Sequence, residues 1–342
     1  MKNSVIIIAE AGVNHNGNLE KAKELIHAAF ESGADYVKFQ SFKASKLVSK
    51  VAEKAAYQKE NMNDDHNLTQ FNMLKKLELS VDDHRILLNH CERLGIKFLS
   101  TAFDVEGLDY LVSIGIELIK IPSGEITNYP YLKRVGELGL NTVLSTGMSS
   151  FQEIQSAVDV LVSSGLALTK LTILHCNTEY PTPMHDVNLL AMNTISNKLG
   201  VPIGYSDHTL GIEVPVAAVA LGARVIEKHF TLDRTLPGPD HVASLEPTEL
   251  KEMVKSIRNI ELAISGDGLK VPSQSEIKNI PIARKSIHLK KNIKKGQLLK
   301  DQDLIALRPG DGISPMKWRN VIGTTATRDM CAGDKLQESD IE

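Results

Sequence analysis

The segment SIGIELIKIPS, residues 113–123, carries the pattern that decides the fold of this chain. A helical pattern ends at a glycine, and an apolar, β-branched run begins directly after it. Glycine after the last helical residue can adopt the left-handed conformation without a steric penalty, so it acts as a helix stop signal. The same pattern precedes six other apolar runs, after Gly33, Gly95, Gly139, Gly165, Gly200 and Gly222.

These junctions and the opening run VIIIAEAG, residues 5–12, predict eight strands that alternate with helices. Continuous apolar strands separated by amphipathic helices are typical of a parallel sheet. Eight such units in about 265 residues match a closed (β/α)8 TIM barrel in number and in length. A doubly wound open sheet is the alternative, but no GxGxxG motif follows the first strand.

Composition and charge narrow the classes of function. The chain has 342 residues, of which 42% are hydrophobic and 24% charged, as expected for a soluble globular protein. A net charge of −3 gives no reason to expect a nucleic-acid or membrane-surface partner. The three cysteines form no CxxC motif, and the first apolar run is too short for a signal peptide or a membrane span. We therefore expect a cytoplasmic protein.

The pattern of predicted elements changes along the chain, from alternating strands and helices to short strands and turns, and this change predicts two domains. Residues 1–266 form the barrel, residues 267–281 a polar linker, and residues 282–342 a small domain of short strands and turns. About 60 residues make only a marginal core, so we expect the small domain to dock on another surface. Residues 43–79 insert extra sequence before the third strand, and insertions of this size over a barrel mouth usually serve as lids or binding loops.

Polar residues gather where the predicted strands end, which is where barrels of this kind carry their active sites. A hydroxyl at a strand-to-loop junction is ordinary, so a single serine there indicates little. A charge within an apolar run is costly unless it is paired. Four polar side chains lie in such runs, namely Lys38, Lys120, Glu227 and His229.

Two histidines, His208 and His229, end the seventh and eighth predicted strands. These strands are neighbours in a barrel, so the two imidazoles can converge. Two imidazoles are too few for a closed zinc site, but they suit an open site in which water and substrate oxygens complete the shell of a Mn²⁺-like ion. Neither HExxH nor CxxC is present, so a structural role for each histidine is the alternative.

A second group of side chains suits a small, dense anion. Donors from different strands can hold a phosphate and a carboxylate together through charge-assisted hydrogen bonds. The candidate donors are Lys38, Lys120, Ser123, Ser145 and Ser206. Glu10 closes an apolar strand, where desolvation can raise its pKa and make it a general base. Its alternative role is that of an ion-pair partner for a lysine.

These residues lie in motifs that closely resemble the N-acetylneuraminate (sialic acid) synthases and their relatives that make legionaminate and pseudaminate. The resemblance covers essentially the whole chain, and its wording is nearest the legionaminate branch. Its C-terminal part, KKNIKKGQLL and IALRPGDGI, resembles the antifreeze-like (SAF) domain of that family. The barrel motifs are AEAGVNHNG, VKFQSF, KIPSGEITNYPYL, LSTGM, LHCNTEYPTP, IGYSDHT, ALGARVIEKHFTLD and GPDH.

The resemblance implies that phosphoenolpyruvate condenses with an N-acetylmannosamine-type sugar and water to give a nine-carbon 2-keto acid and phosphate, with C–O cleavage. It implies a Mn²⁺ ion on His208 and His229, for which Mg²⁺ or Co²⁺ can substitute. The implied catalytic residues are Glu10, Lys38 and Lys120. The implied substrate-binding residues are Gln40, Thr101, Ser123, Glu125, Ser145, Asn177, Tyr180, Ser206, Asp240 and Arg308.

In the family, the arginine contact crosses a domain-swapped homodimer, which the linker and the small domain would also permit. One departure concerns IARKS, residues 282–286, where some relatives carry aromatic residues. The far end of the sugar is therefore expected to be contacted differently. The acceptor sugar stays open between N-acetylmannosamine and 2,4-diacetamido-2,4,6-trideoxymannose.

Two other functions are compatible with the same residues. A barrel lysine, Lys38, Lys120 or Lys228, could form a Schiff base in a metal-free aldolase. The small domain could also be a surface-binding unit on a degenerate barrel, although no strand-end polar group is obviously missing.

Overall fold

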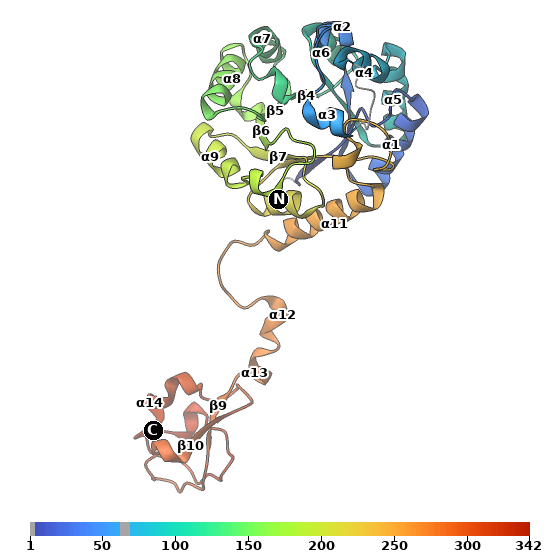
Figure 1. Ribbon diagram of the computed structural model, residues 1–342. Helices are drawn as coiled ribbons and strands as arrows, with labels where there is room; N and C mark the ends of the chain where they lie inside the picture. Colours follow the sequence, from blue (N-terminus) through green and yellow to red (C-terminus); the bar gives the residue numbers. More distant parts are fainter. Residues whose placement is uncertain (1–3, 62–68) are drawn as a thin grey trace. The chain divides into compact units, whose positions relative to one another are not determined.

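The computed structural model describes residues 4–61 and 69–342. The chain divides into two compact units, one ending at Ser265 and the other spanning Gly266–Glu342. Figure 1 shows the first unit as strands surrounded by helices, and the second as a smaller body with a two-stranded sheet. Within the described residues, no helix is both long and apolar enough to cross a membrane.

The first unit is built on one parallel sheet of eight strands in the order β3-β2-β1-β8-β7-β6-β5-β4. This is the sequence order of a ring, and β3 and β4 lie close together at its closing point. The (β/α)8 prediction is therefore confirmed over the open sheet. The strands are β1 (Ile6–Gly12), β2 (Tyr36–Ser41), β3 (Lys97–Ala102), β4 (Leu118–Ile121), β5 (Asn141–Ser145), β6 (Leu171–Cys176), β7 (Ile203–Asp207) and β8 (Val225–His229).

Helices cover the outside of this sheet (Figure 1). All seven glycines of the sequence pattern have positive φ, from 61° at Gly139 to 120° at Gly165, as the helix-stop argument requires. The α-helices are α1 (Leu19–Ser32), α2 (Ala44–Leu47), α3 (Ala56–Asn61), α4 (Gln70–Leu77), α5 (Val81–Leu94), α6 (Val105–Ser113), α7 (Tyr129–Leu138), α8 (Phe151–Ser163), α9 (Leu190–Leu199), α10 (Glu213–Ala220) and α11 (Pro247–Ala263). The 3₁₀ turns are η1 (Ser123–Glu125), η2 (Leu168–Lys170), η3 (Met184–Asp186) and η4 (His241–Ala243).

The barrel interior is apolar towards the start of the strands and polar towards their ends. One buried cluster fills the lower layer with Ile8, Leu99, Leu118, Val143, Leu174 and Val225. Alternate strand residues share a face, so the residue two positions later on each strand also points inward. Those residues are Glu10, Thr101, Lys120, Ser145, Cys176 and Glu227. The alternation of the strands thus places a polar layer directly above an apolar one.

The insertion at 43–79 contains α2, α3 and α4, and its residues 62–68 lie outside the described part of the chain. Met73 and Leu77 of α4 pack with Val13 and Phe42 in a small buried cluster beside the strand ends. Asn61 donates hydrogen bonds to the carbonyl oxygens of Tyr180 and Pro239, at 3.1 and 2.9 Å. These contacts attach the insertion to loops that follow β6 and β8.

The second unit has its own core, formed by ten buried apolar residues around Ile287, Leu289 and Leu304. Its two strands are antiparallel, and isolated bridges such as Ile293–Met330 complete its turns. Two short helices lie in its first residues, between 274 and 283, and most of their length falls in the linker that the sequence predicted at 267–281. Its elements are α12 (Gln274–Ile277), α13 (Ile280–Ala283), β9 (Ser286–Leu289), η5 (Asp301–Asp303), β10 (Leu304–Leu307), η6 (Pro315–Lys317), α14 (Trp318–Val321) and η7 (Glu338–Asp340).

Candidate active site

A cavity of about 500 Å³ lies at the carboxyl ends of the barrel strands. Its floor is the polar layer, and part of its wall comes from the insertion, including Gln70, Met73 and Leu74. Most residues predicted for the site line this cavity. They are Glu10, Lys38, Gln40, Thr101, Lys120, Ser123, Ser145, Tyr180, Ser206, His208, His229 and Asp240.

Two buried ion pairs form the floor of the cavity. Lys38 Nζ lies 2.9 Å from Glu10 Oε2 and donates to Thr101 Oγ1 at 3.0 Å. Lys120 Nζ donates to Glu227 Oε1 at 3.0 Å, and Lys38 also lies 3.7 Å from Glu227 Oε2. The two lysines and the two glutamates therefore form one linked cluster in which each side chain lies beside a partner of opposite charge. This pairing offsets the cost of removing the charges from water.

The two carboxylates of this cluster differ in their pKa. Burial raises the pKa of Glu10 to about 7, although Lys38 pulls it down. Burial also acts on Glu227, but Lys120 and Lys38 outweigh it and lower its pKa to about 2. Near neutral pH, Glu227 is thus a fixed anion, whereas Glu10 can gain or lose a proton.

The position of Glu10 depends on a break in the strand pairing. The register between β1 and β2 shifts between Glu10 and Gly12, as in a β-bulge. Gly12 has φ of 51°, and a Cβ placed there would lie 3.2 Å from Glu10 Oε1 and 3.4 Å from His229 Cε1. Glycine therefore suits both the positive φ and the crowded space at this position. Gln40 Nε2 donates to Glu10 Oε1 at 3.3 Å in the same region.

The two histidines of the sequence pattern lie side by side, with ring centroids 5.3 Å apart. Tyr180 stacks on His208 with a centroid separation of 4.0 Å. His208 Nδ1 hydrogen-bonds to the carbonyl oxygen of Asn177. Since a carbonyl can only accept, Nδ1 carries the proton and Nε2 keeps a free lone pair.

These imidazoles fit a metal ion. Burial lowers the pKa of His208 to about 4 and that of His229 well below its usual range, so both rings are neutral near pH 7. His229 Nδ1 is buried without a hydrogen-bond partner. Within residues 4–61 and 69–342, no group of three or more His, Cys, Asp or Glu side chains converges as a ligand set. The pair therefore suits an open site, in which water and substrate would supply the other ligands.

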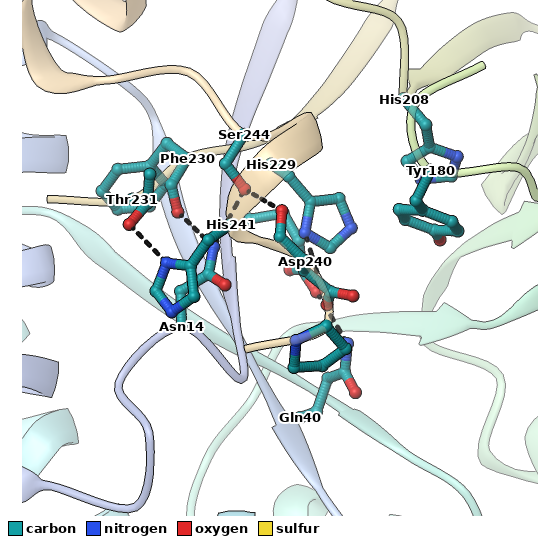
Figure 2. Close-up of polar contacts among 12 residues, drawn as sticks. Asn14, Gln40, Tyr180, His208, His229, Phe230, Thr231, Asp240, His241 and Ser244 are labelled. Carbon is teal, nitrogen blue, oxygen red and sulfur yellow. Dashed lines mark hydrogen bonds and ion pairs between the residues drawn. The ribbon is translucent and has the colours of Figure 1, made fainter. Parts of the chain in front are cut away.

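Asp240 lies next to His229, with Oδ2 3.8 Å from the His229 Nδ1, and burial raises its pKa to about 6. Its backbone is held by a chain of hydrogen bonds that Figure 2 shows. Asn14 Nδ2 donates to Ser244 Oγ at 2.9 Å, and Ser244 Oγ donates to the Asp240 carbonyl at 2.7 Å. Asn14 also donates to the Phe230 carbonyl at 2.8 Å, so the loop after β8 is tied to the loop after β1.

Two predicted sugar contacts of the first unit do not line the cavity. Glu125 lies in η1, where its carboxylate accepts a hydrogen bond from Asn128. Asn177 turns its side-chain oxygen to the Glu179 amide at 2.8 Å and meets His208 through its carbonyl instead. Arg308 belongs to the second unit, where it is exposed and donates to the Ala283 carbonyl at 2.9 Å.

Sequence reasoning missed part of the site. Glu227 was noted as a charge in an apolar run, but its position as common acceptor for Lys120 and Ser206, at 3.0 and 3.1 Å, follows only from the closed ring. The sequence signal that could have placed Glu227 in the site is its two-residue spacing from His229, which puts both side chains on the same face of the strand. Lys228, a candidate for a Schiff base, faces away from the cavity and pairs with Asp207.

Comparison with known proteins gives close relatives over nearly the full length. The N,N'-diacetyllegionaminic acid synthase of Legionella pneumophila is 50% identical over 98% of this chain and 94% of its own length. The enzyme of the same name from Campylobacter jejuni is 50% identical over 97% of this chain and 99% of its own length. A crystal structure of the N-acetylneuraminic acid synthetase of Leptospira borgpetersenii in complex with citrate is 37% identical, with a TM-score of 0.71 over 81% of this chain and 90% of that one.

Two family profiles together cover most of the chain. The SAF domain profile matches residues 284–342. The NeuB family profile matches residues 25–293, which include seven of the eight barrel strands, β2 to β8. With this match and the 50% identity to full-length relatives, the chain belongs to the NeuB family.

Proposed function

We propose that this chain is a nonulosonic acid synthase that condenses phosphoenolpyruvate with an N-acetylated amino sugar and water, giving a nine-carbon 2-keto acid and phosphate. The observation that carries the proposal is one cavity in which two neutral imidazoles face two lysines paired with glutamates. We further propose 2,4-diacetamido-2,4,6-trideoxymannose as acceptor, because relatives at 50% identity are named N,N'-diacetyllegionaminic acid synthases. N-acetylmannosamine is the second candidate.

Phosphoenolpyruvate would bind over the floor of the cavity. Lys38 and Lys120 supply two cations on different strands, which suits a ligand with a phosphate and a carboxylate. Hydroxyls at the rim of the same layer can add hydrogen bonds, and Ser145 Oγ is buried without a partner within the described structure. The hydroxyl donors are Thr101, Ser123, Ser145 and Ser206, with Gln40 beside them.

His208 and His229 would hold a divalent metal, and Mn²⁺ is the ion we propose, with Mg²⁺ or Co²⁺ as substitutes. When bound, such an ion supplies Lewis-acid polarisation of the open-chain aldehyde. Asp240 and Tyr180 border the histidines and would orient the sugar. Glu10, with a pKa of about 7, can hold or release a proton on its carboxylate during the addition of water and the loss of phosphate.

The remaining parts of the proposal concern the assembly. We propose a barrel over residues 1–266, a linker over 267–281 and a SAF domain over 282–342, in a domain-swapped cytoplasmic homodimer. In that dimer, Arg308 would reach the acyl group of the sugar, and Glu125 and Asn177 would approach the sugar once it binds. The family resemblance supports the domain bounds, the dimer and the sugar contacts. The three cysteines, which form no CxxC motif, support a cytoplasmic location. The insertion at 43–79 would cover the bound substrates, as its α4 side chains line the cavity.

The decisive test is phosphate release from phosphoenolpyruvate, measured with each acceptor at matched concentrations. We expect release only with an acceptor present, and a higher kcat/KM with the diacetamido sugar than with N-acetylmannosamine. Equal rates without any acceptor would refute the synthase, whereas preference for N-acetylmannosamine would refute only the choice of sugar.

A Schiff-base aldolase remains a second candidate, because burial lowers the pKa of Lys120, a property that nucleophilic lysines need. Such an enzyme would survive EDTA and would be trapped by borohydride with its keto acid. The synthase predicts loss of activity with EDTA, rescue by Mn²⁺ and no covalent adduct in the mass spectrum.

A further inference from the structure

A third buried ion pair lies directly behind the two histidines. Asp207 and Lys228 are opposite one another in the pairing of β7 and β8, and neither side chain is exposed. Each immediately precedes one of the histidines in sequence. Because strand residues alternate faces, Asp207 and Lys228 point outward from the barrel while His208 and His229 point into the cavity. Consistent with this, neither Asp207 nor Lys228 lines the cavity.

The ion pair also fixes the turn that contains His208. Lys228 Nζ donates to Asp207 Oδ2 at 2.5 Å and to the Thr209 carbonyl. Asp207 Oδ1 accepts from the Thr209 amide, and Oδ2 accepts from the Thr209 hydroxyl, both at 3.0 Å. The residues on both sides of His208 are thus attached to the strand that carries His229.

Stability alone is a weak reason for such a pair. A buried ion pair is often no more stabilising than well-packed apolar side chains of similar volume, because both charges must be desolvated. The pair does have a geometric consequence, since it sets the distance between the ends of two neighbouring strands. A metal site requires its ligands in a fixed arrangement, and groups that orient the ligands affect affinity strongly.

We propose that the Asp207–Lys228 pair, with Thr209, is a positioning device that holds His208 and His229 at the spacing needed to bind one divalent metal ion. This inference rests on the proposed function, in which the two histidines are the metal ligands. Asp207, Lys228 and Thr209 touch neither metal nor substrate and act only through the histidines.

The test measures Mn²⁺ affinity in the full chain, from the electron paramagnetic resonance signal of free Mn²⁺. The double variant Asp207→Leu with Lys228→Met removes both charges and fills the space with apolar groups. We expect it to keep a wild-type melting temperature within a few degrees but to bind Mn²⁺ about 10–100-fold more weakly, as is usual when an outer partner of a ligand is lost. Wild-type Mn²⁺ affinity in a folded double variant would overturn the proposal.

A milder variant guards against failure to fold. Thr209→Val is nearly isosteric and removes only the hydroxyl bond to Asp207, so we expect a smaller loss of Mn²⁺ affinity in the same direction. Asp35→Asn is the matched control, because Asp35 accepts from Arg258 and the Ile7 amide, at 2.9 and 2.7 Å, at the opposite end of the strands. It should lower the melting temperature and leave Mn²⁺ affinity unchanged.

The outcomes separate the two levels of inference. If Thr209→Val and Asp35→Asn affect Mn²⁺ affinity equally, the buried pair contributes only to stability and the positioning proposal falls. If the wild-type chain binds no Mn²⁺ at all, the metal site of the proposed function falls and the positioning role falls with it.

Discussion

Replacing Glu10 by glutamine should change how the stability of the barrel depends on pH. Glu10 is 1% exposed, and burial raises its pKa from 4.5 to about 7. A carboxyl group with a raised pKa in the folded state favours folding while it is protonated in both states, below pH 4.5. That contribution is lost as the pH rises towards 7, because the unfolded chain releases the proton more readily.

The size of the effect follows from the rise in pKa. A change from 4.5 to about 7 corresponds to ~3 kcal/mol of unfolding free energy, lost between those two pH values. Glutamine does not ionise, so the variant lacks this loss. For domains of roughly 150–250 residues, 1 kcal/mol shifts the melting temperature by about 2–4 °C. Relative to wild type, the variant should therefore gain ~6–12 °C between pH 4.5 and pH 8.

The assay is thermal unfolding of both proteins at pH 4.5 and at pH 8, in chelator so that no metal adds its own linkage. Titrating groups outside the cluster of Lys38, Lys120 and Glu227 are common to the two proteins and cancel in the difference. Glu20→Gln, which removes a carboxylate with a side chain 73% exposed, controls for a change in surface charge. An equal difference in melting temperature at both pH values would show that the pKa of Glu10 is not raised.

Four further outcomes are expected. Glu10→Gln should lower turnover by roughly 10²–10⁴-fold if its carboxylate transfers a proton, and near-normal turnover in the folded variant would remove it from the mechanism. EDTA should abolish activity and Mn²⁺ should restore it, while persistence after exhaustive chelation would exclude the metal. Asn14→Asp keeps the shape of the side chain but loses both amide donations, so it should raise the KM for the sugar through Asp240 more than the KM for phosphoenolpyruvate. Asn16→Ala loses the bonds to the Pro237 carbonyl and to His241 but none to Ser244 or Phe230, so it should change neither KM. Arg308→Ala should likewise act mainly on the KM for the sugar, and equal effects on both substrates would contradict its predicted contact.

The fold was predictable because its signals are local. A glycine that ends a helix and an apolar run that starts a strand are each decided within a few residues. The polar layer was predictable for the same reason, since Ile8 and Glu10, or Leu118 and Lys120, share a face by alternation alone. Convergence of His208 and His229 required one further step, the adjacency of strands seven and eight in a closed ring.

Pairing across the barrel was not predictable in this way. Lys38 contacts both Glu10 and Glu227, at 2.9 and 3.7 Å, and this sharing follows from the position of Glu10 beside the bulge at Gly12 and from the stagger of the strands. The full burial of Lys228 was not predictable for a different reason. Alternation predicts that it faces opposite to His229, but only the contact with Asp207 shows how a lysine can be fully buried behind the barrel wall.

In the proposed function, the charge cluster would also link anion binding to the protonation of Glu10. At rest, Lys38 stabilises the ionised form of Glu10, and this attraction is what keeps the pKa of a fully buried carboxylate from rising further than about 7. A phosphate or carboxylate that takes Lys38 as its partner weakens that stabilisation and adds negative charge nearby, so Glu10 should take up a proton. Glu227 cannot serve in the same way, because two lysines hold its pKa near 2. Binding of the anionic substrate would therefore protonate Glu10 but not Glu227. Glu10 would then hold its proton before the addition of water and the loss of phosphate.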